Sequence, residues 1–163
     1  MGDLKKLAKL SLRELKSLTE LPESIGGCHS LVEMNLLKCI SLKHLPASIG
    51  NLHLLEDLCL GKCKTLGTLP EELANCKKLV LLNVSDCAAL QSIPDRFVEL
   101  TNLRELDCSN CVVLKTVPLG IVDLPKLVVC DFTGCPYLED DVVSRSDRLQ
   151  RSRKRRSTSE TYI

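Results

Sequence analysis

The strongest constraint on this chain is a 24-residue period that runs through most of its 163 residues. Three residue types hold the period at fixed positions: Leu7, Leu31, Leu55, Leu79, Leu103 and Leu127; Pro22, Pro46, Pro70, Pro94 and Pro118; and Cys39, Cys63, Cys87, Cys111 and Cys135. A fixed period of this length is typical of stacked repeat proteins, because one unit buries its apolar faces only against its neighbours. The sequence therefore predicts a solenoid.

The positions within one repeat predict its local structure. Counted from its first leucine, the unit reads L-x-x-L-x-L-x-x-C-x-x-L-x-x-L-P-x-x-I-x-x-L-x-x, and we number these positions as slots. Slots four and six are apolar around a mostly polar slot five, which predicts a short half-buried strand. The proline in slot sixteen cannot donate to a sheet ladder, so it ends the strand half of the repeat. Apolar slots three residues apart then suit a short 3₁₀ or helical turn.

This unit resembles the leucine-rich repeat family, whose signature L-x-x-L-x-L-x-x-(N/C)-x-L it matches in six copies over residues 7–138. The resemblance implies an α/β-type solenoid: a horseshoe with a concave parallel sheet of about six short strands and short helical or 3₁₀ turns on the convex side. The cysteine of slot nine, followed by L-x-x-L-P-x-x-I-x-x-L, is most similar to the repeats of plant-type intracellular nucleotide-binding immune receptors. No G-x-x-x-x-G-K-[ST] phosphate loop accompanies these repeats in the sequence.

The resemblance implies a noncatalytic protein-interaction module, ligand-sensing or autoinhibitory in intracellular defence signalling. We expect no enzyme and no cofactor, because the three histidines are scattered and no nucleophile elbow is present. Polar residues of slots three, five and eight are expected on the concave face as partner contacts: Glu33, Asn35, Asp57, Lys62, Asn83, Asp86, Glu105, Asp107 and Asp131. Their acidic surplus predicts a basic partner, and the alternative is a solvated sheet face without a docking role.

Cysteines fill slot nine in five repeats. Cysteine is small and readily buried, and its thiol is a weak donor, so it can replace the asparagine that usually bonds the neighbouring repeat in this family. We expect a ladder of free thiols, because side chains that point the same way do not meet the geometry of a disulfide. The spacing of Cys108, Cys111, Cys130 and Cys135 is also close to that of a zinc ribbon. A zinc-dependent structural domain is therefore an alternative, although repeat positions alone account for all four and predict no metal.

The repeat pattern divides the chain into a solenoid over residues 1–143 and a basic tail over residues 144–163, which we expect to be disordered. We expect Leu4–Leu7 to cover one end of the solenoid, and Tyr137, Val142 and Val143 to cover the other. The tail contains a basic run that resembles a nuclear import signal or a polyanion contact: Arg153, Lys154, Arg155 and Arg156. Thr161 and Ile163 complete an ending that resembles a PDZ ligand. A signalling scaffold tethered through this tail is thus an alternative function. The alternative for the tail itself is that it only increases solubility.

Charge and hydropathy set the expected location. The net charge of +1 provides no overall field for nucleic acid, and we expect no sequence-specific nucleic-acid binding. Charged residues interrupt the first apolar segment, which is unlike a secretory signal, and no apolar run is long enough to span a bilayer. We therefore expect a cytoplasmic protein, with nuclear import through the basic run as an option.

Overall fold

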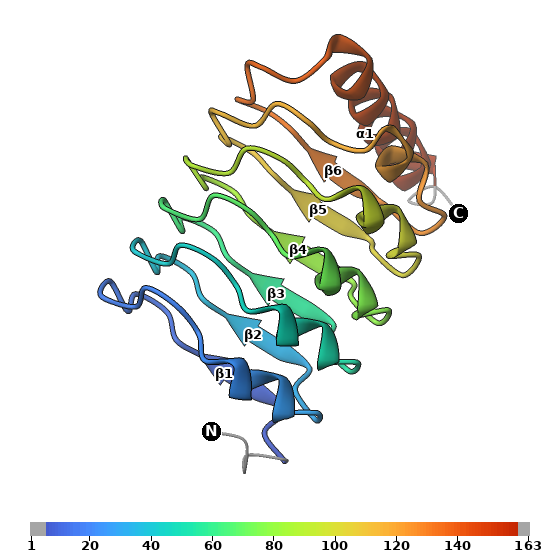
Figure 1. Ribbon diagram of the computed structural model, residues 1–163. Coiled ribbons are helices and arrows are strands. Elements are labelled where there is room, and N and C mark those ends of the chain that lie inside the picture. Colours follow the sequence, from blue (N-terminus) through green and yellow to red (C-terminus); the bar gives the residue numbers. More distant parts are fainter. Residues whose placement is uncertain (1–5, 160–163) are drawn as a thin grey trace.

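The computed structural model describes the backbone of residues 6–159 and the side chains of residues 6–149. Six strands form one parallel sheet in the order in which they occur in the sequence, and this confirms the predicted solenoid (Figure 1). The strands are β1 (Lys9–Ser11), β2 (Glu33–Asn35), β3 (Asp57–Cys59), β4 (Leu81–Asn83), β5 (Glu105–Asp107) and β6 (Val129–Asp131). Neighbouring strands pair residues 24 positions apart, as in Leu58 with Leu82, so each slot forms a straight row across the sheet.

Each strand is three residues long and spans slots three to five. The central residue points into the core, where Leu58, Leu82 and Leu106 are fully buried. Three residues after each strand, slot eight adopts the left-handed conformation, as in Lys62 at φ 63° and Asp86 at φ 56°. That conformation reverses the chain out of the sheet. The expectation that slot-eight residues lie on the concave face with the strand residues was therefore wrong: Lys62 and Asp86 lie in the turns beside the sheet.

A layer of 3₁₀ helices lies on the opposite side of each repeat from the sheet (Figure 1). These helices are η1 (Glu23–Gly27), η2 (Ala47–Asn51), η3 (Glu71–Asn75), η4 (Asp95–Glu99) and η5 (Leu119–Asp123). Each follows its slot-sixteen proline, whose carbonyl accepts the first i→i+3 hydrogen bond, as from Ile49 N–H to Pro46 at 3.1 Å. The predicted three-residue spacing is thus the 3₁₀ period, and it buries slots nineteen and twenty-two of the first five repeats.

The slot-nine thiols form the expected ladder. Each donates to the slot-six carbonyl of the preceding repeat at 3.0–3.3 Å, as Cys87 Sγ does to Leu60 O at 3.2 Å. None of the ten cysteines forms a disulfide, and nine of them are buried. Burial raises the pKa of Cys63 and Cys111 to about 12, which keeps these thiols protonated as donors. The ladder therefore joins consecutive repeats through hydrogen bonds between buried groups.

The C-terminal segment differs from the expected disorder. Helix α1 (Asp140–Ser159) lies against β6 and η5 at the end of the stack (Figure 1). Val142 and Ser146 are 3% and 2% exposed, and Leu149 packs on the same core, so a stripe with helical spacing covers the last repeat. Asp140 and Asp141 in the first turn stabilise the start of α1, because their negative charges interact favourably with the partial positive charge at the helix N-terminus. The amino-acid composition of this segment did not indicate the stripe, because its few packing residues lie among polar and basic ones.

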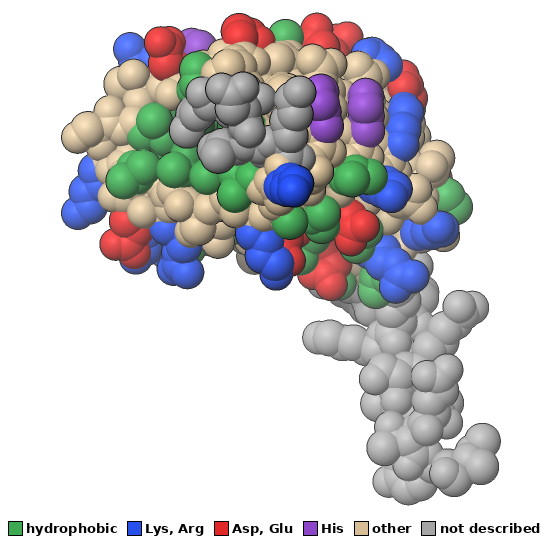
Figure 2. All heavy atoms as spheres, turned by 90° about the horizontal axis from the view of Figure 1, so that it is seen from below, with side chains coloured by type: hydrophobic (Ala, Val, Ile, Leu, Met, Phe, Trp, Pro, Cys, Tyr) green, Lys and Arg blue, Asp and Glu red, His purple; other side chains and the backbone are tan. Residues whose placement is uncertain are grey.

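The two ends of the solenoid are covered unequally. Val142 covers the C-terminal end as expected, but Tyr137 is 64% exposed and lies outside the core, which corrects its predicted capping role. At the other end, four leucines of the first repeat are only partly buried, namely Leu7, Leu10, Leu12 and Leu18, and Leu15 is 47% exposed. Figure 2, which views the molecule from the β1 end, shows hydrophobic side chains gathered there. Of the segment Leu4–Leu7 that was expected to cover this end, residues 4 and 5 lie outside the described range, and Leu7 is partly buried against the core.

Candidate functional site

The concave sheet presents two rows of outward-facing side chains. The slot-three row consists of Lys9, Glu33, Asp57, Leu81, Glu105 and Val129, and the slot-five row of Ser11, Asn35, Cys59, Asn83, Asp107 and Asp131. Parallel strands space successive residues of a row by about 4.8 Å. The structure therefore brings together seven of the nine predicted partner-binding residues, all of them except Lys62 and Asp86.

The slot-five side chains have a structural role that sequence analysis missed. Four of them accept a hydrogen bond from the backbone N–H two residues later: Asn35, Asn83, Asp107 and Asp131, at 2.8–3.0 Å. This bond stabilises the turn that ends each strand. The signal was present as Asn or Asp two residues before Ser or Thr in three repeats. Substitutions at slot five would consequently change the turn as well as the surface charge.

The slot-three side chains are available for partners. Lys9 Nζ lies 2.7 Å from Glu33 Oε1 at the edge of the row. Within residues 6–149, Asp57 and Glu105 make no ion pair or side-chain hydrogen bond. Partial burial raises the pKa of Asp57, and the charges of Glu33 and Glu105 add to this effect while Lys9 opposes it. The centre of the row is thus a site of negative potential that lacks a compensating cation.

A hollow of about 260 Å³ lies at the centre of these rows. Its lining consists of Glu33, Met34, Asn35, Asp57, Cys59, Leu81 and Asn83. Leu81 is half-buried and contributes apolar surface between the acidic residues of the slot-three row. A long side chain with an aliphatic stem and a cationic head matches this combination, because the stem packs on Leu81 while the head approaches Asp57.

Replacing Asp57 with asparagine should stabilise the fold at neutral pH by a few tenths of a kcal/mol, since it removes like-charge repulsion across strands. The folded-state pKa of Asp57 lies above its ordinary value, so the ionised carboxylate destabilises the fold once pH exceeds the unfolded-state pKa. The gain should therefore be present at pH 7 and absent at pH 3. Thermal melts of Asp57→Asn and of a convex-side control, Asp95→Asn, measure this; equal gains at both pH values would contradict it.

The four cysteines with zinc-like spacing occupy ordinary repeat positions. Cys108 and Cys130 fill core slots six and four, and burial raises the pKa of Cys130 to about 12. Cys111 and Cys135 belong to the ladder and donate to Val84 O and Cys108 O at 3.2 and 3.1 Å. Among the described residues, no group of three or more His, Cys, Asp or Glu side chains has an arrangement that could hold a metal ion.

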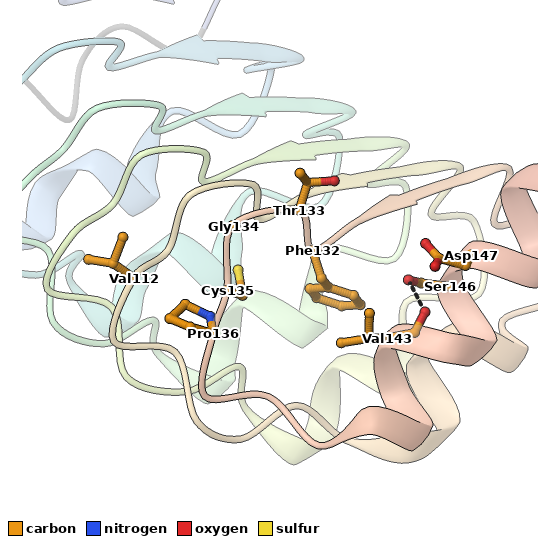
Figure 3. Close-up of a pocket in the computed structure, with 9 residues that line it drawn as sticks. All are labelled: Val112, Phe132, Thr133, Gly134, Cys135, Pro136, Val143, Ser146 and Asp147. Carbon is orange, nitrogen blue, oxygen red and sulfur yellow. Dashed lines mark hydrogen bonds between the residues drawn. The ribbon is translucent and has the colours of Figure 1, made fainter.

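A further cavity of about 480 Å³ lies between the last repeat and α1 (Figure 3). Phe132 and Val143 face each other across it, and Ser146 Oγ donates to Val143 O at 2.9 Å on the helix side. The sequence did not indicate this cavity, because its second wall is helix α1, which was not expected. It borders the cap of the solenoid rather than the concave rows.

Comparisons with known proteins identify the fold. Models of known protein families and curated protein sequences give no match. Among solved structures, the leucine-rich repeat ectodomain of the receptor kinase SOBIR1 from Arabidopsis thaliana is 26% identical with a TM-score of 0.61, covering 80% of this chain and 71% of that one. The BIR2 ectodomain from the same plant is 25% identical with a TM-score of 0.56, covering 80% of this chain and 68% of that one.

A third structure extends the same conclusion. The Arabidopsis receptor kinase HAESA, in complex with the peptide hormone IDA and the co-receptor SERK1, is 22% identical with a TM-score of 0.61. The match covers 85% of this chain but only 25% of HAESA, so this chain spans a small part of that receptor. The chain therefore has the fold of a leucine-rich repeat solenoid, a fold that generally serves as a protein- or ligand-binding module. Between residues 6 and 159, no helix has the length and apolar character needed to cross a membrane.

Proposed function

We propose that this chain is a noncatalytic protein-interaction module that binds a basic segment of a partner protein on its concave face. The observation that carries this proposal is the centre of the slot-three row, where the unpaired Asp57 and Glu105 flank the apolar Leu81. Complementary charge of this kind steers association and selects partners. The slot-five carboxylates of Asp107 and Asp131 add to the negative potential, even though one oxygen of each accepts a turn N–H.

The contact extends beyond the sheet. Six strands spaced by about 4.8 Å, each about 17 Å long with its flanking residues, offer roughly 500 Å². A standard protein interface buries about 800 Å² on each partner. The adjoining turns are the nearest additional surface, and Lys62 and Asp86 lie there. We therefore place these two residues at the rim of the interface.

The thiol ladder supports a cytoplasmic setting and a role in intracellular defence signalling, as a ligand-sensing or autoinhibitory segment. Five buried thiols act as hydrogen-bond donors between repeats, a role that requires them to stay reduced. Reducing compartments maintain free thiols, whereas secreted proteins usually oxidise them. The resemblance of these cysteine-containing repeats to those of intracellular nucleotide-binding immune receptors adds the defence context.

Charge reversal of the slot-three row tests the proposal. The probe is a fluorescein-labelled octapeptide that alternates lysine with alanine, measured by fluorescence anisotropy. We expect Asp57→Lys/Glu105→Lys to weaken binding at least about ten-fold, because two attractive contacts become repulsive. The control, Glu71→Lys/Asp95→Lys, makes the same change of net charge in η3 and η4 and should bind like the original chain. Equal binding by both double variants would refute the proposal.

A second candidate function is a signalling scaffold tethered through the C-terminal segment. It is favoured by the continuation of the α1 backbone to Ser159, past Leu149, which packs on the core. The backbone of the basic run Arg153–Arg156 lies on that part of the helix, and its side chains are outside the described range. Thr161 and Ile163 also lie outside the described range. Removing residues 150–163 should then abolish binding to a polyanion such as heparin or to a PDZ domain; unchanged binding to both would exclude it.

A further inference from the structure

A second charged surface lies beside the concave rows, where strands β3 to β5 begin. It is a groove of about 280 Å³, lined by Glu56, Lys78, Val80, Asn102, Arg104 and Lys126. We call it the strand-start groove. Its lining contains three cations and a single carboxylate, the opposite balance from the slot-three row next to it.

The repeat holds these cations in place. Lys78, Asn102 and Lys126 occupy slot twenty-four of three consecutive repeats, and Arg104 occupies slot two. Asn102 is half-buried; its Nδ2 donates to Lys77 O at 2.7 Å, and its Oδ1 accepts from Lys126 Nζ at 2.7 Å. The Asn102 amide therefore links three repeats and orients Lys126.

Two of the cations have no compensating partner. Within residues 6–149, the side chains of Lys78 and Arg104 make no ion pair or hydrogen bond. The Arg104 backbone is fixed by the sheet, since its N–H donates to Val80 O at 2.8 Å and its carbonyl accepts from Val128 N at 2.6 Å. Arg104 is thus an exposed guanidinium on a rigid backbone, and this suits recognition of a carboxylate.

We propose that the strand-start groove binds an acidic segment of the same partner whose basic segment lies on the slot-three row; this inference rests on the proposed function. Arg104 directly precedes Glu105, and slot two lies three residues before slot five. At about 3.3 Å per residue, slot two lies about 3 Å along the strand from the slot-three row and about 10 Å from the slot-five carboxylates, such as Asp107, that add to its negative potential. An extended peptide with its acidic and basic residues one to three positions apart spans these distances.

Charge argues against a nucleic acid in the groove. A continuous polyanion that enters the groove would extend over Glu105 and Asp107 on the neighbouring rows, where it would be repelled. A short run of carboxylates within a peptide of mixed charge avoids this repulsion. The groove therefore selects for an alternation of charge in the partner rather than for negative charge alone.

Two labelled peptides test the inference. The first has the sequence Glu-Glu-Ala-Ala-Lys-Ala-Lys. The second has glutamine in place of both glutamates and is otherwise identical. We expect the original chain to bind the glutamate peptide about ten-fold more tightly. The variant Lys78→Glu/Arg104→Glu should lose this difference in affinity between the two peptides and should still bind the glutamine peptide. The control Lys43→Glu/Lys64→Glu makes the same change of net charge at exposed residues and should retain the difference in affinity.

The outcomes separate the two proposals. Equal binding of both peptides by the original chain would overturn the groove proposal and leave the proposed function intact, while no binding of the glutamine peptide would overturn the proposed function. Tighter binding of a uridine dodecamer than of either peptide, lost in Lys78→Glu/Arg104→Glu, would overturn the groove proposal in favour of nucleic acid. If that variant melts earlier than the original chain, Lys78→Ala/Arg104→Ala replaces it with the same expected loss.

Discussion

Replacing Leu82 with alanine should lower the free energy of unfolding by about 3 kcal/mol, as is typical of a fully buried leucine that leaves a cavity. Leu82 is 0% exposed at the centre of β4 and pairs in register with Leu58 and Leu106. Because each repeat contacts mainly its neighbours, a cavity in a central repeat also weakens the coupling between the two halves of the stack. The expected loss is a large fraction of the about 5–15 kcal/mol that stabilises an ordinary domain.

The matched control is the equivalent leucine of the first repeat. Leu10 is only partly buried at the open end of the sheet, so Leu10→Ala should cost about 1 kcal/mol. Urea unfolding followed by circular dichroism measures both variants. Equal losses for Leu10→Ala and Leu82→Ala would contradict the one-dimensional stack, since a central and a terminal repeat would then contribute alike.

Replacing Cys87 with aspartate should destabilise the fold by about 3–5 kcal/mol at neutral pH, because it places an uncompensated carboxylate in the core. Cys87 is 0% exposed, and its thiol donates to Leu60 O at 3.2 Å between the ladder positions of Cys63 and Cys111. Burial already raises the pKa of the Cys87 thiol, with the neighbouring thiols adding to the effect. The same environment would oppose ionisation of a carboxyl group.

The pH dependence distinguishes this mechanism from a steric one. An acid whose folded-state pKa is raised destabilises the fold above its unfolded-state pKa, so the deficit of Cys87→Asp should shrink as pH falls to about 4. The control, Cys87→Ser, keeps a donor of similar size and should cost about 1–2 kcal/mol at every pH. Urea unfolding at pH 4 and pH 7 measures both variants; a deficit that stays constant in Cys87→Asp would contradict the buried-carboxylate explanation.

The sequence predicted those features that repeat. The apolar slots predicted the strand cores, the slot-sixteen prolines predicted where the 3₁₀ turns begin, and the slot-nine cysteines predicted the thiol ladder. Each of these depends on contacts within one repeat or with the adjacent repeat, 24 positions away in the sheet and 27 positions away in the thiol ladder, so the period contains the necessary information. The slot-three candidates Glu33, Asp57 and Glu105 followed from the same periodicity.

Features without a repeat were harder to predict. The α1 stripe of Val142, Ser146 and Leu149 occurs once and includes a serine, so the composition of the surrounding residues concealed it. The left-handed slot eight is occupied by Glu, Lys, Asp, Asn and Gly, a set with no single chemical signature. The strand-start groove combines slots twenty-four and two from different repeats, and only the folded stack brings them together.

The most direct test of the central claim is to map where the basic octapeptide contacts this chain. A ¹H–¹⁵N correlation titration should shift the amide signals of the outward-facing strand residues in β2 to β5, above all those of Asp57, Leu81 and Glu105. Signals from η2 to η4 should stay in place, because these helices lie on the opposite side of the repeat (Figure 1). Shifts confined to the 3₁₀ layer or to α1, with the strand signals unmoved, would contradict the account.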